Sequence, residues 1–167
     1  MSELEWILFI LAALLFLWYL TFTASRLDRL HHRVETSWAS LDALLQRRAA
    51  IALEMAHIPS LDPASAVVLT RSAYLAREAE MAERSEAEES LTNAIALIAE
   101  SEDFHTEFPE ISERLEVVTQ RIRIAIGIHR EAVATTKTQR SRLIVRIFRL
   151  SGTAPLPVVY PFEELPL

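Results

Sequence analysis

The sequence contains no cysteine and only two glycines, Gly127 and Gly152. Without cysteine the chain forms no disulfide, holds no metal through thiolates and has no cysteine nucleophile. Two glycines are too few for the Gly-rich loops that bind phosphates or dinucleotides. They also argue against a fold built from β-hairpins, whose tight turns favour glycine or asparagine. The 167 residues suffice for one domain, and the net charge of −6 does not favour binding to nucleic acid.

Charge is missing altogether from residues 6–25, a run of 20 mostly apolar residues. A transmembrane helix needs about 20 such residues to cross roughly 30 Å of hydrocarbon. Aromatic residues of the kind found at membrane interfaces mark its two ends: Trp6 at one, and Trp18, Tyr19 and Phe22 at the other. A cleaved secretory signal is the alternative, but the first five residues carry Glu3 and Glu5 and no basic residue. The run therefore predicts a membrane-spanning helix within residues 1–25.

The basic residues around this run predict its orientation. Arg26, Arg29 and Arg33 follow it, and no basic residue precedes it. The positive-inside rule then places the N-terminus outside and residues 26–167 in the cytoplasm. All 40 charged residues, 17 basic and 23 acidic, lie outside the run. We expect a single-pass protein of the cell membrane that carries an ordinary soluble domain.

Helix-forming residues dominate the soluble part. Apolar residues recur at steps of three and four between Leu27 and Met55. Because no break separates this pattern from the apolar run, it predicts one helix from about Trp6 to His57. Asp62 and Pro63 predict the start of the next helix, since aspartate caps helices and proline fits their first turn.

The last helix follows a short polar link at residues 101–105; it is predicted to be capped at or near Thr106, to have Pro109 in its first turn and to end near Leu150. Ser151 and Gly152 follow there as a stop signal. Four prolines in residues 153–167 predict an extended tail. The resulting divisions are a tail and transmembrane helix at 1–25, a helical domain at 26–150 and a Pro-rich tail at 151–167.

The middle segment, residues 63–102, leaves the number of helices open. Its central acidic residues have the pattern of a solvated helix face: Glu78, Glu80, Glu83, Glu86, Glu88 and Glu89. Ser85 and Glu88 also have the spacing of a capping box, which favours a chain reversal there. The sequence therefore predicts an all-α fold, an N-terminal transmembrane helix that continues into an antiparallel up-and-down helical bundle. Four helices are preferred, and three long helices are the alternative.

Two blocks of the chain resemble the LemA family. Residues 27–48, L-D-R-L-H-H-R-V-E-T-S-W-A-S-L-D-A-L-L-Q-R-R, follow the anchor directly and contain the family's Trp, Asp and paired Arg, here Trp38, Asp42, Arg47 and Arg48. Residues 111–164 show the family's long helix, proline-containing turn and Phe followed by acidic residues. His129-Arg130 and Lys137 depart from the pattern, which has Tyr-Asn and Asn there. The resemblance implies a bacterial, membrane-tethered helical bundle and no catalytic residues.

The individual residues that could form a functional site are interpreted as structural residues. We expect Trp38 to anchor the core, because a tryptophan buries much apolar area. Asp42 is off the i,i+4 spacing from Arg47 and Arg48, so one of these arginines should pair with another helix. The five histidines lack the spacing of a helical metal site: His31, His32, His57, His105 and His129. Together with the lack of a convincing Ser-His-Asp set, this predicts no metal, no cofactor and no catalytic site.

The end of the last helix is strongly basic. Lys137 precedes four arginines, Arg140, Arg142, Arg146 and Arg149, and no acidic residue occurs between Glu131 and Glu163. Interleaved apolar residues make this segment an amphipathic cationic helix, the kind that binds anionic lipid headgroups. The alternative is a bundle helix with an arginine-rich exposed face. With four helices, this end returns to the membrane.

These patterns predict a non-catalytic scaffold or protein-interaction module at the cytoplasmic membrane, with the membrane and an unidentified protein as its partners. One alternative is a membrane-bound hydrolase, or the accessory subunit of an enzyme, with a site between helices. Another is a module that binds anionic lipid through its arginine-rich helix. An enzyme should show a concave cleft with convergent polar groups, and a scaffold a filled core and an exposed patch.

Overall fold

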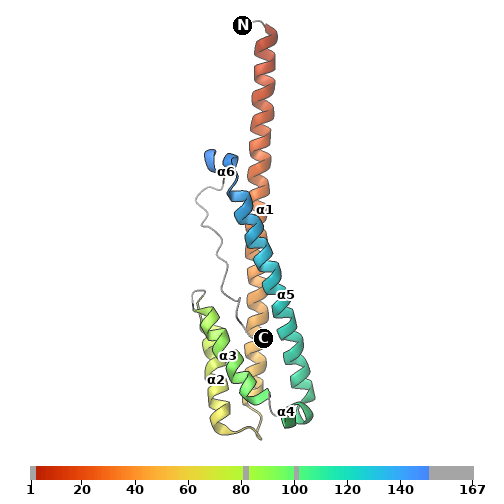
Figure 1. The fold of residues 1–167 in the computed structure, drawn as a ribbon, viewed down its shortest axis with the longest axis vertical. Helices are drawn as coiled ribbons and strands as arrows, with labels where there is room; N and C mark the ends of the chain where they lie inside the picture. The colour runs from red at the N-terminus through yellow and green to blue at the C-terminus, as the bar shows by residue number, and fades with distance from the viewer. Residues whose placement is uncertain (1–2, 81–82, 100–101, 151–167) are drawn as a thin grey trace. The chain divides into compact units, whose positions relative to one another are not determined.

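The computed structural model describes residues 3–80, 83–99 and 102–150 (Figure 1). Six helices connected by short links make up these residues: α1 (Glu3–Ala56), α2 (Pro63–Glu78), α3 (Arg84–Ala99), α4 (Glu102–Glu107), α5 (Pro109–Arg140) and α6 (Leu143–Ile147). No strand occurs in this part of the chain. The predicted all-α class is therefore confirmed.

Helix α1 runs without interruption through the apolar run and beyond it. Its 54 residues match the helix predicted from Trp6 to His57 to within a turn. Its most apolar window of 18 residues has a mean hydropathy of 2.3, and none of that window is buried. By length and composition α1 qualifies as a membrane-spanning helix near the N-terminus.

The middle segment forms two helices that lie side by side (Figure 1). The Asp62 carboxylate accepts the backbone N–H of Ser65 at 2.9 Å, so α2 starts with the predicted cap. The chain leaves α2 after Glu78 and re-enters a helix at Arg84. Because α3 already includes Ser85, the capping-box interpretation of Ser85 and Glu88 is wrong, although the reversal that it favoured is present.

The last predicted helix is divided into α5 and α6, because α5 ends at Arg140 rather than near Leu150. The expected polar link at 101–105 is also partly helical: α4 covers Glu102–Glu107, so Thr106 lies inside a helix and does not cap the next one. The Ser141 hydroxyl donates to the Thr138 carbonyl at 2.8 Å, and Arg142 then adopts an extended backbone before α6. A serine that hydrogen-bonds to nearby carbonyls in this way competes with helix continuation. The stop at Ser151-Gly152 and the Pro-rich tail lie outside the described residues.

The described residues belong to two compact units. We call residues 3–36 and 130–150 the anchor unit, and residues 37–129 the core unit. Helices α1 and α5 each contribute a stretch to both, α2, α3 and α4 belong to the core unit, and α6 belongs to the anchor unit.

The core unit is held by a continuous cluster of buried apolar side chains from all five of its helical segments. Its larger members are Leu41, Leu45, Met55, Leu69, Leu91, Ile95, Ile98, Phe104, Val118 and Ile122. Burial of one such side chain contributes about 1.5–3 kcal/mol to folding. At the surface, Arg114 on α5 binds the Glu54 carboxylate on α1 through two hydrogen bonds of 2.9 and 2.8 Å. These hydrogen bonds lower the pKa of Glu54.

The anchor unit has a smaller contact between α1 and the end of α5. Leu27 and Val133 are buried there. The Thr136 hydroxyl donates to the Ala132 carbonyl at 2.8 Å and lies 3.4 Å from the Leu30 carbonyl. Threonine is common at such close helix–helix contacts, because its small side chain satisfies its hydroxyl on its own helix.

Replacement of Gly127 by alanine should stabilise the protein. Gly127 lies within α5, its surroundings are exposed, and a Cβ at this position would have no atom within 4 Å. Glycine inside a helix costs about 0.5–1 kcal/mol relative to alanine, so Gly127→Ala should raise the free energy of unfolding by that amount. Chemical denaturation in detergent, followed by circular dichroism, measures the change.

The reciprocal control is Ala134→Gly, at an exposed position of the same helix, which should lower the unfolding free energy by about as much. A Gly127→Ala protein less stable than its parent would show that this stretch of α5 requires glycine.

Candidate functional site

Four charged side chains from α1 and α3 form a network inside the core unit. Glu88 and Arg84 come from α3, one turn apart, and Arg48 and Asp42 come from α1. The side chains of Glu88 and Arg48 are 0% and 2% exposed, and Arg84 is nearly as buried. Charged residues are rarely so buried unless they are paired, which makes this network the most unusual cluster among the described residues.

Each oxygen of the Glu88 carboxylate faces one arginine. Arg48 Nη2 donates to Oε2 at 2.6 Å, and Arg84 Nε lies 3.4 Å from Oε1. Arg84 also donates to the carboxylate of Asp42, which is partly exposed, and to the backbone carbonyl of Ala79 at 3.3 Å. Arg48 donates a second bond, at 3.3 Å, to the Glu88 carbonyl. Two positive and two negative charges therefore balance within the network.

Burial of the network affects both the pKa of Glu88 and the contribution of the ion pairs to stability. Burial raises the pKa of the Glu88 carboxyl, and the charges of Arg48 and Arg84 oppose that rise. A guanidinium does not lose its proton in a protein, so the two arginines need a carboxylate beside them. Buried pairs of this kind add little net stability, but removal of one member leaves a buried charge without its partner.

The sequence-predicted family residues divide between the network and the surface. Asp42 and Arg48 belong to the network, and Arg48 pairs with another helix as expected of one of the two arginines. Arg47 is exposed and takes no part in it. Trp38 packs partly buried against the core, with its ring centroid 5.6 Å from that of His129.

Two members of the network, Arg84 and Glu88, were missed by sequence reasoning, which placed Glu88 on a solvated face. The other acidic residues of that run (Glu78, Glu80, Glu83, Glu86 and Glu89) are indeed exposed. A signal was present: Glu88 stands three residues before Leu91 and seven before Ile95, on the buried stripe of α3. An acidic residue on an apolar stripe, with arginine four residues earlier, indicates a buried ion pair.

The sequence places His129 on the apolar stripe of the last helix, as a departure from the family pattern, and it is a buried residue of α5. Its Nδ1 shares a hydrogen bond of 2.9 Å with the Ser37 hydroxyl on α1. Burial lowers the pKa of the His129 imidazole, because the charged form loses its hydration. The ring is therefore neutral at pH 7 and joins α1 to α5 within the core unit.

Three members of the network are buried from solvent, and only Asp42 is partly exposed; Glu88 Oε2 accepts a hydrogen bond from Arg48, whereas Oε1 has an ion contact with Arg84 and no hydrogen bond. Among the described residues, no group of three or more His, Asp or Glu side chains is placed to hold a metal ion. Hollows in the core unit are instead open grooves. One lies between α2 and α3, and its lining includes Val68, Glu86, Glu89 and Leu97.

No protein-family model, no curated protein and no solved structure matches this chain. The LemA resemblance therefore stays a prediction from sequence.

Neutralising Glu88 should destabilise the protein strongly. Glu88→Gln keeps the shape of the side chain but leaves Arg48 and Arg84 without a buried counter-charge, which should cost about 3–5 kcal/mol of unfolding free energy. Glu89→Gln, at the exposed neighbouring position, should change stability by less than about 0.5 kcal/mol. Denaturant titration of the two variants in parallel makes the comparison.

A double variant tests whether this loss of unfolding free energy arises from a buried arginine left without its partner. Arg48→Met combined with Glu88→Met removes both members of the closest pair while Arg84 keeps Asp42, so it should be more stable than either single variant. Equal effects of Glu88→Gln and Glu89→Gln would contradict the burial of the network.

Acidification should destabilise the protein through His129. The folded-state pKa is depressed, so the unfolded chain takes up a proton near pH 6.5 and the folded chain only at lower pH. The stabilisation is complete above the unfolded pKa and declines as the pH falls, by at most about 1.4 kcal/mol per pH unit. Unfolding free energies of the parent and of His129→Gln between pH 7.5 and 5 measure this, and parallel pH profiles would refute it.

Proposed function

We propose that this protein is a single-pass membrane protein of the LemA type whose helical domain binds another protein and catalyses no reaction. The observation that carries the proposal is the continuity of α1. Its exposed, uncharged stretch has the length of a membrane span, and the same helix supplies Leu41, Leu45 and Met55 to the core unit. A helix of this kind tethers a folded domain to a membrane without a flexible linker.

The proposed topology follows from the flanking charges. Arg26, Arg29 and Arg33 favour a cytoplasmic location for the residues after the span. Within the core unit, the proposed bundle has four long segments, contributed by α1, α2, α3 and α5. The reversal between α2 and α3 supports this four-segment arrangement over three long helices.

The buried network supports a non-catalytic role. An active site needs a polar group that a substrate can reach, and the Glu88 carboxylate, whose pKa burial raises, is enclosed between two arginines. The hydrolase and accessory-subunit alternatives would place such a group in an inter-helix cleft. Two grooves formed by α2 and α3 are lined mainly by apolar, serine and glutamate side chains, and a third, on α4 and α5, includes His105 and Glu113.

The surface of α2 and α3 is the proposed binding face. Five exposed large apolar side chains lie on these two helices, and three more, Val117, Ile124 and Ile128, lie on α5. Those of α2 and α3 are Val67, Val68, Tyr74, Leu75 and Leu97. Val68 and Leu97 line one groove together with Glu86 and Glu89. Exposed apolar residues rimmed by charge are typical of protein-binding surfaces. The acidic rim favours a partner segment that is apolar and basic.

A photo-crosslinking amino acid at Leu97, in the full-length protein in its native membranes, tests both parts of the proposal. The full-length chain should remain in the membrane pellet after carbonate extraction, and illumination should yield a discrete adduct. Glu86→Lys combined with Glu89→Lys should abolish that adduct, since it reverses the rim charge beside the groove.

The matched control places the crosslinker at Arg121, exposed on α5, where no adduct at that mass should form. Release of the parent chain by carbonate would refute the anchor. An adduct that forms equally from Arg121, or that survives the two lysine substitutions, would refute the α2–α3 binding face.

A further inference from the structure

The short helix α6 and its flanks expose apolar side chains that the fold does not cover. We call residues 142–149 the α6 segment. Leu143 and Ile147 are 72% and 69% exposed, and Phe148 is nearly half exposed. Val145 points the other way and is buried. Leu143 and Ile147 are one turn apart, so they form a continuous outward apolar face opposite the buried one.

The α6 segment lies against the apolar run of α1, within the anchor unit. The rings of Phe148 and Phe16 meet edge to face, with centroids 5.4 Å apart. Phe16 precedes Tyr19 by three residues, or about 4.5 Å along the helix axis. Tyr19 and Trp18 are the aromatic residues expected at the membrane interface. The α6 segment therefore lies beside the half of the apolar run that leads to its charged end, and Phe16 is ten residues, or about 15 Å along the helix axis, from Arg26.

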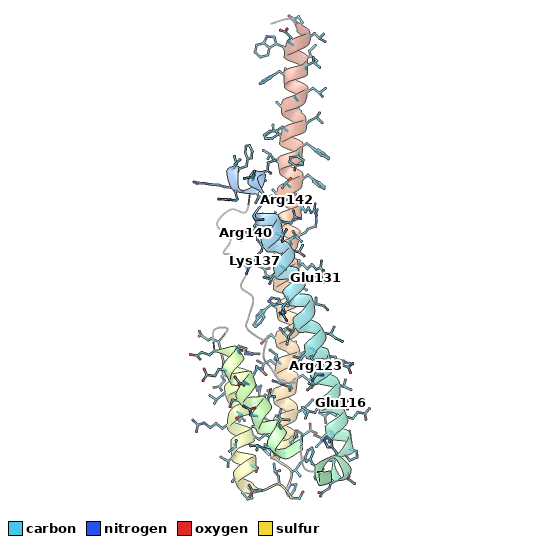
Figure 2. All side chains as sticks on the ribbon, in the orientation of Figure 1. Glu116, Arg123, Glu131, Lys137, Arg140 and Arg142 are labelled. Carbon is cyan, nitrogen blue, oxygen red and sulfur yellow. The ribbon has the colours of Figure 1, made fainter. Side chains whose placement is uncertain are left out.

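The charges around this contact have one sign. Arg142, Arg146 and Arg149 are exposed, and the sequence has no acidic residue from 132 to 162. Figure 2 shows Glu131, Lys137, Arg140 and Arg142 following one another toward the end of α5 that leads into α6. The stretches 26–36 and 130–149 together hold nine basic residues and three acidic ones, although the whole chain has a net charge of −6. The acidic residues are Asp28, Glu35 and Glu131. The basic residues are Arg26, Arg29, Arg33, Arg130, Lys137, Arg140, Arg142, Arg146 and Arg149.

From these observations we propose that the α6 segment binds the anionic phospholipid leaflet that surrounds the charged end of the α1 span. Leu143, Ile147 and Phe148 enter the acyl boundary beside α1. Arg142, Arg146 and Arg149 extend back to the headgroup phosphates, as long basic side chains do at interfaces. The inference rests on the proposed membrane anchor and adds a second, headgroup-selective contact to it.

A membrane fits this surface better than a protein does. The apolar face is continuous, through Phe148 and Phe16, with side chains of α1 that are themselves exposed along most of the uncharged run. Whatever covers that run also reaches the α6 segment. The arginines then lie where an anionic leaflet concentrates negative potential, worth about a fivefold change in affinity for each basic residue.

The absence of native cysteine allows single reporter cysteines in the full-length protein. Ile147→Cys reports on the α6 segment, Leu11→Cys on the span and Leu97→Cys on the exposed surface of α3. Each carries a nitroxide, and the protein is reconstituted in phosphatidylcholine vesicles with or without phosphatidylglycerol. Collision with oxygen marks a label in lipid, and collision with a water-soluble nickel chelate marks a label in water.

We expect lipid accessibility at positions 11 and 147 and water accessibility at position 97 in vesicles that contain phosphatidylglycerol. Changing Arg142, Arg146 and Arg149 together to glutamine should shift the label at 147 toward water by roughly a hundredfold in equilibrium constant. Omission of phosphatidylglycerol should act in the same direction. The matched control, Arg71, Arg121 and Arg123 changed together to glutamine, alters the same charge on the core unit and should leave position 147 in lipid.

The labels at positions 11, 97 and 147 distinguish a failure of the α6 inference from a failure of the proposed membrane anchor. Lipid contact at position 11 with water at position 147 would overturn the α6 inference and leave the anchor standing. Water at both positions would overturn the anchor itself. If the label at position 147 stays in lipid both after the three arginine substitutions and in vesicles without phosphatidylglycerol, the proposed selectivity for anionic headgroups would be overturned. A label at 147 that is shielded from both oxygen and nickel would assign the segment to a protein contact and overturn the proposal.

Discussion

The Glu88 carboxylate, enclosed between Arg48 and Arg84, is the interaction on which the core unit depends. A buried charge of either sign tolerates only arrangements that bring its partners within hydrogen-bond reach. Apolar side chains can slide past one another at modest cost, but these three groups fix the register of α3 against α1. Asp42 extends the same pairing toward solvent, so the chain accepts one alignment of these helices and disfavours those shifted by a turn.

The all-α class and the helices up to α2 could be predicted from the sequence because they do not depend on this tertiary pairing. The steps of three and four between Leu27 and Met55 encode α1 directly, and Asp62 with Pro63 encodes the start of α2. These are local signals, because each depends on neighbours within one or two turns. The predicted cross-helix partner of one arginine was correct for Arg48, although its identity was not accessible from spacing.

The features that sequence reasoning missed depend on tertiary contacts or leave no sign in the composition. Glu88 looks like its exposed neighbours until α1 supplies Arg48, and only its position on the Leu91–Ile95 stripe marks it. The end of α5 at Arg140 was missed because no glycine or proline occurs between Lys137 and Leu150, so the composition gives no sign of the break at Ser141 and Arg142. One short helix, α4, was hidden in a segment whose composition is polar.

The two units differ in charge as well as in packing. Residues 37–129 hold sixteen acidic and eight basic residues, whereas the flanking part of the anchor unit is basic. This segregation has a consequence for crowding. In the membrane arrangement proposed above, neighbouring copies would present like-charged acidic surfaces to one another, and the repulsion would act over a Debye length of about 8 Å at physiological ionic strength. Their lateral spacing would then depend on the salt concentration of the surrounding fluid, with wider spacing at low salt.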